Sequence, residues 1–255
     1  MCTLIEAINT FKENNRNIID ESKLVYDWNG WDDKSTSMLF HWFHVDLKYA
    51  LDCGTEADVK KIIQRILNWG GINKIDDNTL NTYIGILNAF EQQIQWPNPP
   101  IRSTIISQDH PVGSQQQTHL PSWTKILAAY NPNSYSIYDA RVAVALRIVC
   151  PDTKWFLPHS SATYNKTAKA LIDYFKEQER QEQKQQQEQQ QDQLSQRESY
   201  DEYLVLLRET GNPVKYERTL FMLVDAILRT RQNGAQYINV LMNDGRRMAF
   251  DLPQD

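Results

Sequence analysis

Two side chains in the centre of the chain, those of Lys125 and Asp139, are of types that could do chemistry together. A lysine amine that is partly removed from water can attack an electrophilic carbon and form a Schiff base. A carboxylate held close to a carbon that gains positive charge stabilises the transition state electrostatically. The two residues are therefore candidates for a nucleophile and an electrostatic stabiliser in a bond-breaking reaction.

Both candidates lie in residues 120–149, where the sequence predicts a helix, a turn and a second helix. Ser122 is a good N-cap for the first helix and places Lys125 in its first turn. The Asn-Pro-Asn run at 131–133 must end this helix, because proline has no amide to donate and restricts the residue before it. Asp139 is the natural N-cap of the second helix, whose apolar residues recur at helical spacing. They are Val142, Ala143, Leu146 and Val149.

The same residues also have purely structural interpretations. Asp139 could serve only as a helix cap, and Lys125 could be an ordinary solvated charge on a helix surface. Arg141 could pair with Asp139 or contact a phosphate. Trp123 and Tyr138 are aromatic residues of the kind that more often fills a core than contacts a ligand. Residue types and spacing alone leave these alternatives open.

The order and composition of this stretch resemble the active-site region of the helix-hairpin-helix DNA glycosylases, most closely the 8-oxoguanine glycosylase branch. In that branch a Leu-Pro-Gly-x-Gly-Thr-Lys hairpin carries the catalytic lysine, and a following x-Val-Asp-x-His segment carries the catalytic aspartate. Here residues 120–125, Leu-Pro-Ser-Trp-Thr-Lys, resemble the first motif, and residues 137–141, Ile-Tyr-Asp-Ala-Arg, resemble the second. The resemblance is confined to residues 120–149 of the 255.

The resemblance implies a DNA glycosylase that cleaves the N-glycosidic bond of a damaged or modified base. Asp139 would stabilise the positive charge that builds on the sugar, and Lys125 would be the nucleophile of an associated strand-cleaving (AP-lyase) activity. The target base would be flipped out of the duplex into a pocket lined by Ala129 and Tyr138. The residues implied in DNA binding are Ser122, Trp123, Thr124 and Arg141. The resemblance implies no cofactor and no metal.

The stretch departs from the family pattern in ways that bear on the substrate. The hairpin is one residue shorter and lacks both glycines, which argues against the usual phosphate contact through its backbone amides. The interval from Lys125 to Asp139 is also shorter than in that family, so the helix between the two residues must be shorter as well. Ala129 stands where the oxoguanine enzymes shape part of their pocket, so a bulky base is a further candidate substrate. The sugar-decorated cytosine of some phage genomes is such a base, and the resemblance would also suit an antiviral glycosylase.

Composition limits the partners. The formal net charge is −5, so the chain gains no general attraction to DNA and would need a local basic patch. The candidates for that patch are Lys125, Arg141, Arg147 and Lys154. Three scattered cysteines are too few for a disulfide framework or an iron–sulfur cluster, and the histidines form no ligand-like cluster with them. The sequence therefore predicts no metal site.

The chain begins without a hydrophobic stretch of signal length, and no apolar run approaches the ~18 residues of a membrane span. We therefore expect a cytoplasmic monomer without membrane contact, whose partner is double-stranded DNA that carries a damaged or modified base.

Helical periodicity extends over most of the chain. It predicts helices at residues 4–11, 35–51, 55–68, 77–96, 165–175, 200–207 and 217–230. In the second of these, Ser35 is the expected cap, and the expected buried side carries Met38, Leu39, Trp42, Phe43 and Leu47. Residues 101–119 break the pattern and are expected to form a connector or a substrate-contacting loop.

The C-terminal part has two features of its own. The glutamine-rich residues 177–196 cannot bury a core, so we expect a solvated helical extension or a disordered insert. Asp244-Gly245 separates two extended runs, which predicts a small terminal β-hairpin. The expected fold is mainly α, a helix-hairpin-helix glycosylase-like fold of two helical subdomains. These are expected at residues 1–100 and 101–255, on either side of a cleft faced by Lys125 and Asp139.

Two other functions compete with the glycosylase. A non-catalytic DNA-binding protein on the same helical fold would bind through phosphate contacts, with salt-sensitive and weakly specific affinity. Its function would survive the loss of the Asp139 carboxylate. A helical protein-interaction module would use the glutamine-rich residues as its partner surface, and deletion of residues 177–196 would then abolish function.

Overall fold

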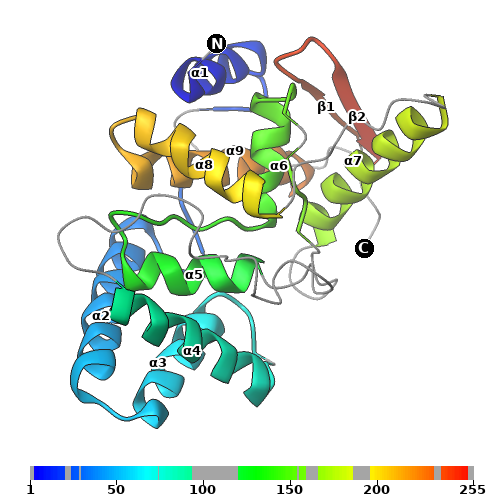
Figure 1. Cartoon of the computed structure of the whole chain (residues 1–255). Coiled ribbons are helices and arrows are strands. Elements are labelled where there is room, and N and C mark those ends of the chain that lie inside the picture. Colours follow the sequence, from blue (N-terminus) through cyan, green and yellow to red (C-terminus); the bar gives the residue numbers. More distant parts are fainter. Residues whose placement is uncertain are drawn as a thin grey trace. The chain divides into compact units, whose positions relative to one another are not determined.

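The computed structural model describes residues 3–20, 24–28, 30–73, 75–93, 120–153, 155–158, 166–185, 196–232 and 237–251. Within these ranges the chain forms nine helices and one two-stranded antiparallel sheet, which confirms the mainly helical class (Figure 1). The connector at 101–119, Lys154 and residues 186–195 of the glutamine-rich stretch lie outside the described residues.

The chain divides into two compact units that differ from the expected halves. The inserted unit is Asp27–Tyr138, and the discontinuous unit joins Met1–Tyr26 to Asp139–Asp255. A boundary at residue 100 does not fit, because helix α5 packs against helices that precede residue 100, while the first helix packs against one that follows it. Lys125 therefore belongs to the inserted unit, and Asp139 begins the second part of the discontinuous unit.

The inserted unit is a four-helix cluster. Its helices are α2 (Asp33–Cys53), α3 (Glu56–Trp69), α4 (Asp77–Gln93) and α5 (Leu120–Tyr130). Helix α3 contacts all three others, and α5 also packs on α2 (Figure 1). Thr55 and Asp58 form a reciprocal capping box at the start of α3, as Ser/Thr and an acidic residue three positions on commonly do. The buried apolar face of α3 matches the periodicity of its sequence.

Helix α2 differs from the prediction in its start and in its buried face. Asp32, rather than Ser35, is its N-cap, and the Asp32 carboxylate accepts the amide of Ser35. Met38 is 57% exposed and Trp42 is 55% exposed, so the expected buried side was wrong at both positions. Phe43 and Leu47 are buried as expected. The other buried positions of the helix are Thr36 and Ala50.

The discontinuous unit is built around helix α6 (Ala140–Val149), which contacts three other helices of the unit (Figure 1). Nearly all residues of α6 are buried, as a helix enclosed by its neighbours must be. Its partners are α1 (Leu4–Asn14), α7 (Lys166–Gln185) and α9 (Pro213–Gln232). Helix α8 (Gln196–Glu209) packs on α9. Residues 177–185 of the glutamine-rich stretch are helical as the end of α7, which confirms the helical alternative there.

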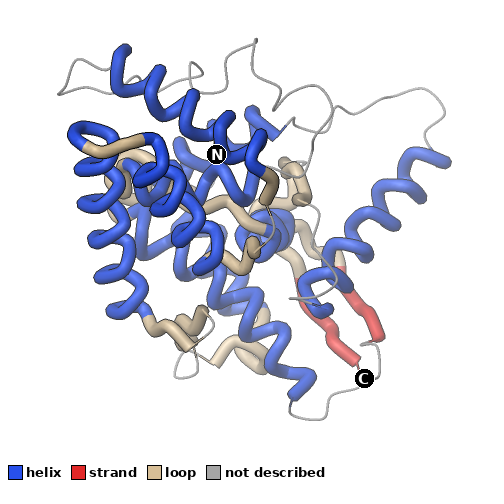
Figure 2. The backbone as a smooth tube through the Cα atoms, turned by 90° about the horizontal axis from the view of Figure 1, so that it is seen from below, coloured by secondary structure: helices blue, strands red, loops and turns tan. Residues whose placement is uncertain are grey.

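The expected terminal hairpin is confirmed. Strands β1 (Tyr237–Leu241) and β2 (Arg247–Asp251) pair antiparallel, with Tyr237 opposite Asp251 (Figure 2, red). Gly245 takes a φ of +84° in the connecting turn, a conformation that side chains rarely adopt. The Asn15 side chain holds β1 by donating to the Leu241 carbonyl and accepting its amide, at 2.8 and 2.9 Å. The side-chain amide of Asn15 thus makes the two backbone hydrogen bonds to Leu241 that a neighbouring strand would otherwise make.

Candidate functional site

Lys125 is a buried residue of helix α5 rather than a solvated surface charge. Its side chain is part of the core of the inserted unit, with 3% of the residue exposed. The Nζ atom donates to the Pro121 carbonyl one turn earlier, at 3.1 Å. It also lies over the ring of Trp28, 5.8 Å from the centroid. A lysine that is buried with its charge directed at a carbonyl and an aromatic face has a restricted environment, as functional lysines often do.

The start of α5 differs from the prediction, because the helix begins at Leu120 and Ser122 lies inside its first turn. Pro121 fits there, since the first turn of a helix does not need its amide. Ser122 is buried and hydrogen-bonds the hydroxyl of Tyr83 on α4. Burial raises the pKa of the Tyr83 hydroxyl well above its usual range. The expected cap is therefore a residue that joins two helices.

Trp123 is a core residue of the inserted unit. Its side chain is fully buried, and its indole stacks on the Tyr83 ring with centroids 5.1 Å apart and planes 13° apart. This placement argues against the expected DNA contact and agrees with the structural alternative. The amphipathic pattern of α5 could not separate the two, because the helix is buried along almost its whole length.

Thr124 joins α5 to the segment that leads into Asp139. Its Oγ1 accepts the Tyr138 amide at 3.1 Å and lies 3.4 Å from the Tyr138 carbonyl. Both residues are fully buried in the inserted unit. The residue before Lys125 is thus hydrogen-bonded to the residue before Asp139. We call this pair of contacts the Thr124 clasp.

The clasp can be tested through stability. Replacing Thr124 with valine keeps the shape of the side chain but leaves the buried Tyr138 amide without its acceptor. We expect the free energy of unfolding to fall by roughly 1–3 kcal/mol, measured by chemical denaturation. Thr82→Val is the matched control, because the Thr82 hydroxyl bonds the Asn78 carbonyl on an exposed face of α4. An equal effect of the two substitutions would show that the clasp contributes nothing specific.

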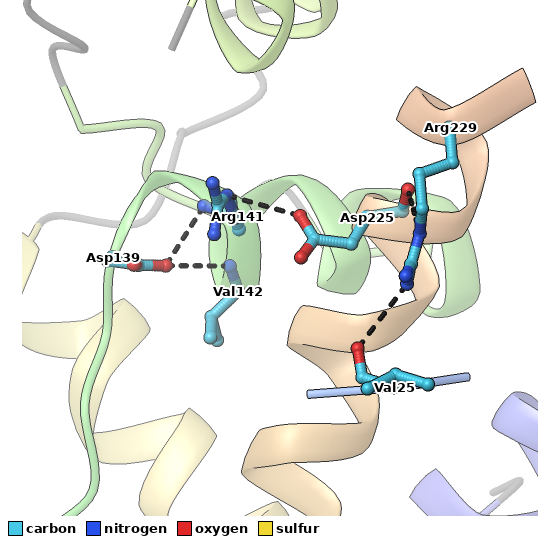
Figure 3. Close-up of polar contacts among 6 residues, drawn as sticks. All are labelled: Val25, Asp139, Arg141, Val142, Asp225 and Arg229. Carbon is cyan, nitrogen blue, oxygen red and sulfur yellow. Dashed lines mark hydrogen bonds and ion pairs between the residues drawn. The ribbon is translucent and has the colours of Figure 1, made fainter. Parts of the chain in front are cut away.

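Asp139 is the N-cap of α6, as predicted. Its Oδ1 accepts the backbone amides of Arg141 and Val142, at 3.0 and 3.1 Å (Figure 3). The residue is 7% exposed, so the carboxylate is held rigidly at the helix N-terminus. The positive end of the helix dipole favours a negative charge in this position. The cap role is real, and it also orients the carboxylate for any further role.

The Arg141 side chain is engaged on helix α9, and Asp139 binds only its backbone amide. Its Nε lies 3.4 Å from the Asp225 carboxylate, and its guanidinium lies over the Phe221 ring, 4.3 Å from the centroid (Figure 3). Neither expected alternative, a pair with the Asp139 carboxylate or a phosphate contact, describes this arrangement. Arg229 on the same helix donates to the Asp225 and Val25 carbonyls. Helix α9 therefore holds the start of α6 in place.

The two expected pocket residues are buried in the inserted unit. Ala129 is fully enclosed in α5, and Tyr138 is fully buried at the clasp. In this structure neither presents a surface to a base. The resemblance placed them by sequence position alone, and the packing of α5 on α2 and α3 occupies that side of the helix.

Three of the four cations expected to form a basic patch lie within the described residues, and none of the three is exposed. Arg147 is buried on α6 and pairs with Glu179 at 2.6 Å. Arg141 pairs with Asp225, Lys125 is buried, and Lys154 lies outside the described residues. The three cations of the sequence prediction that the structure describes are therefore buried or paired, and none of them is an exposed charge that would attract DNA.

Sequence reasoning missed the residues that surround the two candidates. Trp28 and Gly70 both lie against Lys125, and no role in a site was predicted for either of them. Asp225 and Phe221 hold Arg141, although they were assigned only to a helix. Their signal in the sequence was weak, because all four contacts join residues far apart along the chain.

The two histidines within the described residues both lie on helix α2. His41 is exposed, and His44 Nδ1 lies 2.8 Å from the Tyr130 carbonyl. No group of three or more histidine, cysteine or acidic side chains in the described ranges is arranged to hold a metal ion. No helix in the same ranges is long and apolar enough to cross a membrane.

Comparison of the chain with protein-family models, with curated proteins and with solved structures found no match.

Proposed function

We propose that the chain is a DNA glycosylase that excises a damaged or modified base, with Asp139 and Lys125 as its catalytic residues. The observation that carries the proposal is the Thr124 clasp. It fixes, within the inserted unit, both the turn of helix that bears Lys125 and the chain that leads into Asp139. Sequence resemblance selected the same two residues from their order and type. We further propose that the enzyme acts on double-stranded DNA as a cytoplasmic monomer.

The proposed chemistry follows from the two side chains. Breaking the bond between C1′ and the base nitrogen leaves positive charge on the sugar, and the Asp139 carboxylate would stabilise it. The electron pair of the broken bond goes to the base, which takes up a proton as it leaves. Water can then bond to C1′ and give an abasic site. If the neutral amine of Lys125 bonds to C1′ instead, its nitrogen loses a proton and the C1′–O4′ bond breaks, with the electron pair going to O4′, which takes up a proton. This opens the sugar ring and leaves a Schiff base between Lys125 and C1′, from which strand cleavage can follow.

The burial of Lys125 and Asp139 supports these roles. Both are nearly enclosed, so neither is an ordinary surface charge. In such surroundings charges interact more strongly than in water, and a fixed carboxylate costs little reorganisation when the sugar becomes positive. The restrained amine likewise has one preferred position, which is what a nucleophile requires.

The test is release of free bases. The purified full chain is incubated with unmodified, oxidised and methylated DNA, and with phage DNA that carries hypermodified cytosine, and released bases are identified by mass spectrometry. Release of one base, lost in Asp139→Asn, is the expected result. Sodium borohydride trapping then separates the two routes, because only the Schiff base is reduced to a stable adduct. DNA binding with no release from any substrate would favour the non-catalytic DNA-binding protein.

A further inference from the structure

The aliphatic part of Lys125 passes directly over Gly70, at the end of helix α3. A Cβ built on Gly70 would lie 2.4 Å from the lysine Cδ and 2.6 Å from its Cε, far inside contact distance. The backbone of Gly70 does not require glycine, since its φ of −72° and ψ of 5° are open to any residue. The glycine is therefore needed for space, and the space is occupied by the lysine side chain.

The amine end of the same side chain lies over Trp28, whose position is fixed by α3. The Trp28 indole donates its Nε1 hydrogen to the Trp69 carbonyl at 2.9 Å, and the two rings lie 5.5 Å apart. Trp69 in turn packs edge-on against Phe40 of α2, with centroids 4.7 Å apart and planes at 79°. Trp28 thus bonds the carbonyl that directly precedes Gly70. One short stretch of backbone supports both ends of the Lys125 side chain.

We propose that Gly70 and Trp28 are positioning residues for Lys125, and that together with the Pro121 carbonyl they form a seat that sets the place and the reactivity of its amine. In this seat Gly70 leaves space for Cδ and Cε of the lysine, the Trp28 ring lies against its amine, and the Pro121 carbonyl accepts a hydrogen bond from that amine. The proposal rests on the proposed function, in which this amine attacks the sugar carbon. A lysine has four rotatable side-chain bonds, so without such supports its amine would occupy many positions.

The seat can be tested without DNA, through reductive methylation of the folded full chain by formaldehyde and cyanoborohydride. Mass spectrometry of peptides gives the labelling rate of Lys125 relative to the exposed Lys61 over a range of pH. We expect slow labelling in the unaltered protein. In Gly70→Ala the new methyl group displaces the flexible end of the lysine, so the rate should rise several-fold and its pH profile should move.

Matched variants separate the seat from general effects on folding. Gly85→Ala is the control for Gly70→Ala, because a Cβ at Gly85 in helix α4 meets nothing within 4 Å. Trp28→Leu removes the aromatic ring and should also raise the labelling rate. Trp28→Phe keeps a ring but loses the hydrogen bond to the Trp69 carbonyl, so it should raise the rate less than Trp28→Leu. Thermal unfolding of each variant confirms that it is folded. An unchanged rate and pH profile in both Gly70→Ala and Trp28→Leu would overturn the proposal.

The DNA assay gives a second, separable result. If the unaltered protein releases a base, Gly70→Ala should lower kcat by about 100-fold with little change in KM, since a misplacement of about 1 Å can cost that much. An unchanged kcat would overturn the catalytic part of the proposal. If the unaltered protein releases no base, the proposed function fails, and the methylation result alone still decides whether the seat exists.

Discussion

Replacing Asp139 with asparagine should slow base release by about 10²–10³-fold while helix α6 stays in place. The carboxylate oxygen that accepts the Arg141 and Val142 amides can be replaced by the amide oxygen of asparagine, which is as good an N-cap as aspartate. The negative charge is lost, however, and with it the stabilisation of the positive sugar. Loss of one such electrostatic interaction typically costs about 10²–10³-fold in kcat. Single-turnover base release at saturating enzyme measures this loss directly.

The chain offers a matched control for this substitution at the start of α2. Asp32 is also an aspartate N-cap, and its carboxylate accepts the Ser35 amide at 2.7 Å. Asp32→Asn should leave base release unchanged, because only the carboxylate at 139 has a proposed catalytic role. Asp139→Ala should lose both the activity and about 1 kcal/mol of stability, since alanine cannot cap. A fully active Asp139→Asn would reduce Asp139 to the helix cap that its sequence context also predicts.

Features governed by neighbouring residues could be predicted from the sequence. The Asp139 cap needs only a short polar side chain two or three residues before free amides. The terminal hairpin needs only Asp-Gly between two extended runs, and Gly245 takes the positive φ that this turn requires. The start of α3 at Thr55 has the same local origin. In each case the determining interaction spans four residues or fewer.

Features governed by packing between distant residues could not be predicted in the same way. Met38 and Trp42 have the hydrophobicity of core residues, yet α3 and α5 pack on another side of α2. Ser122 was expected to cap the start of a helix, but its side chain hydrogen-bonds Tyr83 of α4. The unit boundaries have the same cause. Helix α1 packs on α6, although the whole inserted unit lies between them in the sequence. Hydrophobic periodicity predicts that one face of a helix is buried, but it does not identify the element that packs on that face.

Replacing Arg147 with methionine should destabilise the discontinuous unit by about 3–5 kcal/mol, the usual result when one partner of a buried ion pair is removed. The sequence alone suggested a surface cation that could attract DNA. In the structure Arg147 is 6% exposed, its Nε donates to the Trp155 carbonyl at 2.7 Å, and its guanidinium pairs with Glu179 at 2.6 Å. Methionine fills most of the volume but leaves the Glu179 carboxylate and the Trp155 carbonyl unpaired. Urea denaturation followed by circular dichroism measures the loss.

Two further variants separate the cost of an unpaired charge from the cost of altered packing. Glu179→Gln removes the second charge, so Arg147→Met with Glu179→Gln should recover part of the stability that Arg147→Met loses. Arg180→Met is the surface control. Arg180 lies on α7, the helix that also carries Glu179, and pairs there with Glu177 in an exposed position. Exposed pairs contribute roughly 0–1 kcal/mol. If Arg147→Met cost no more than Arg180→Met, the buried pair of Arg147 and Glu179 would contribute no more to stability than an exposed pair.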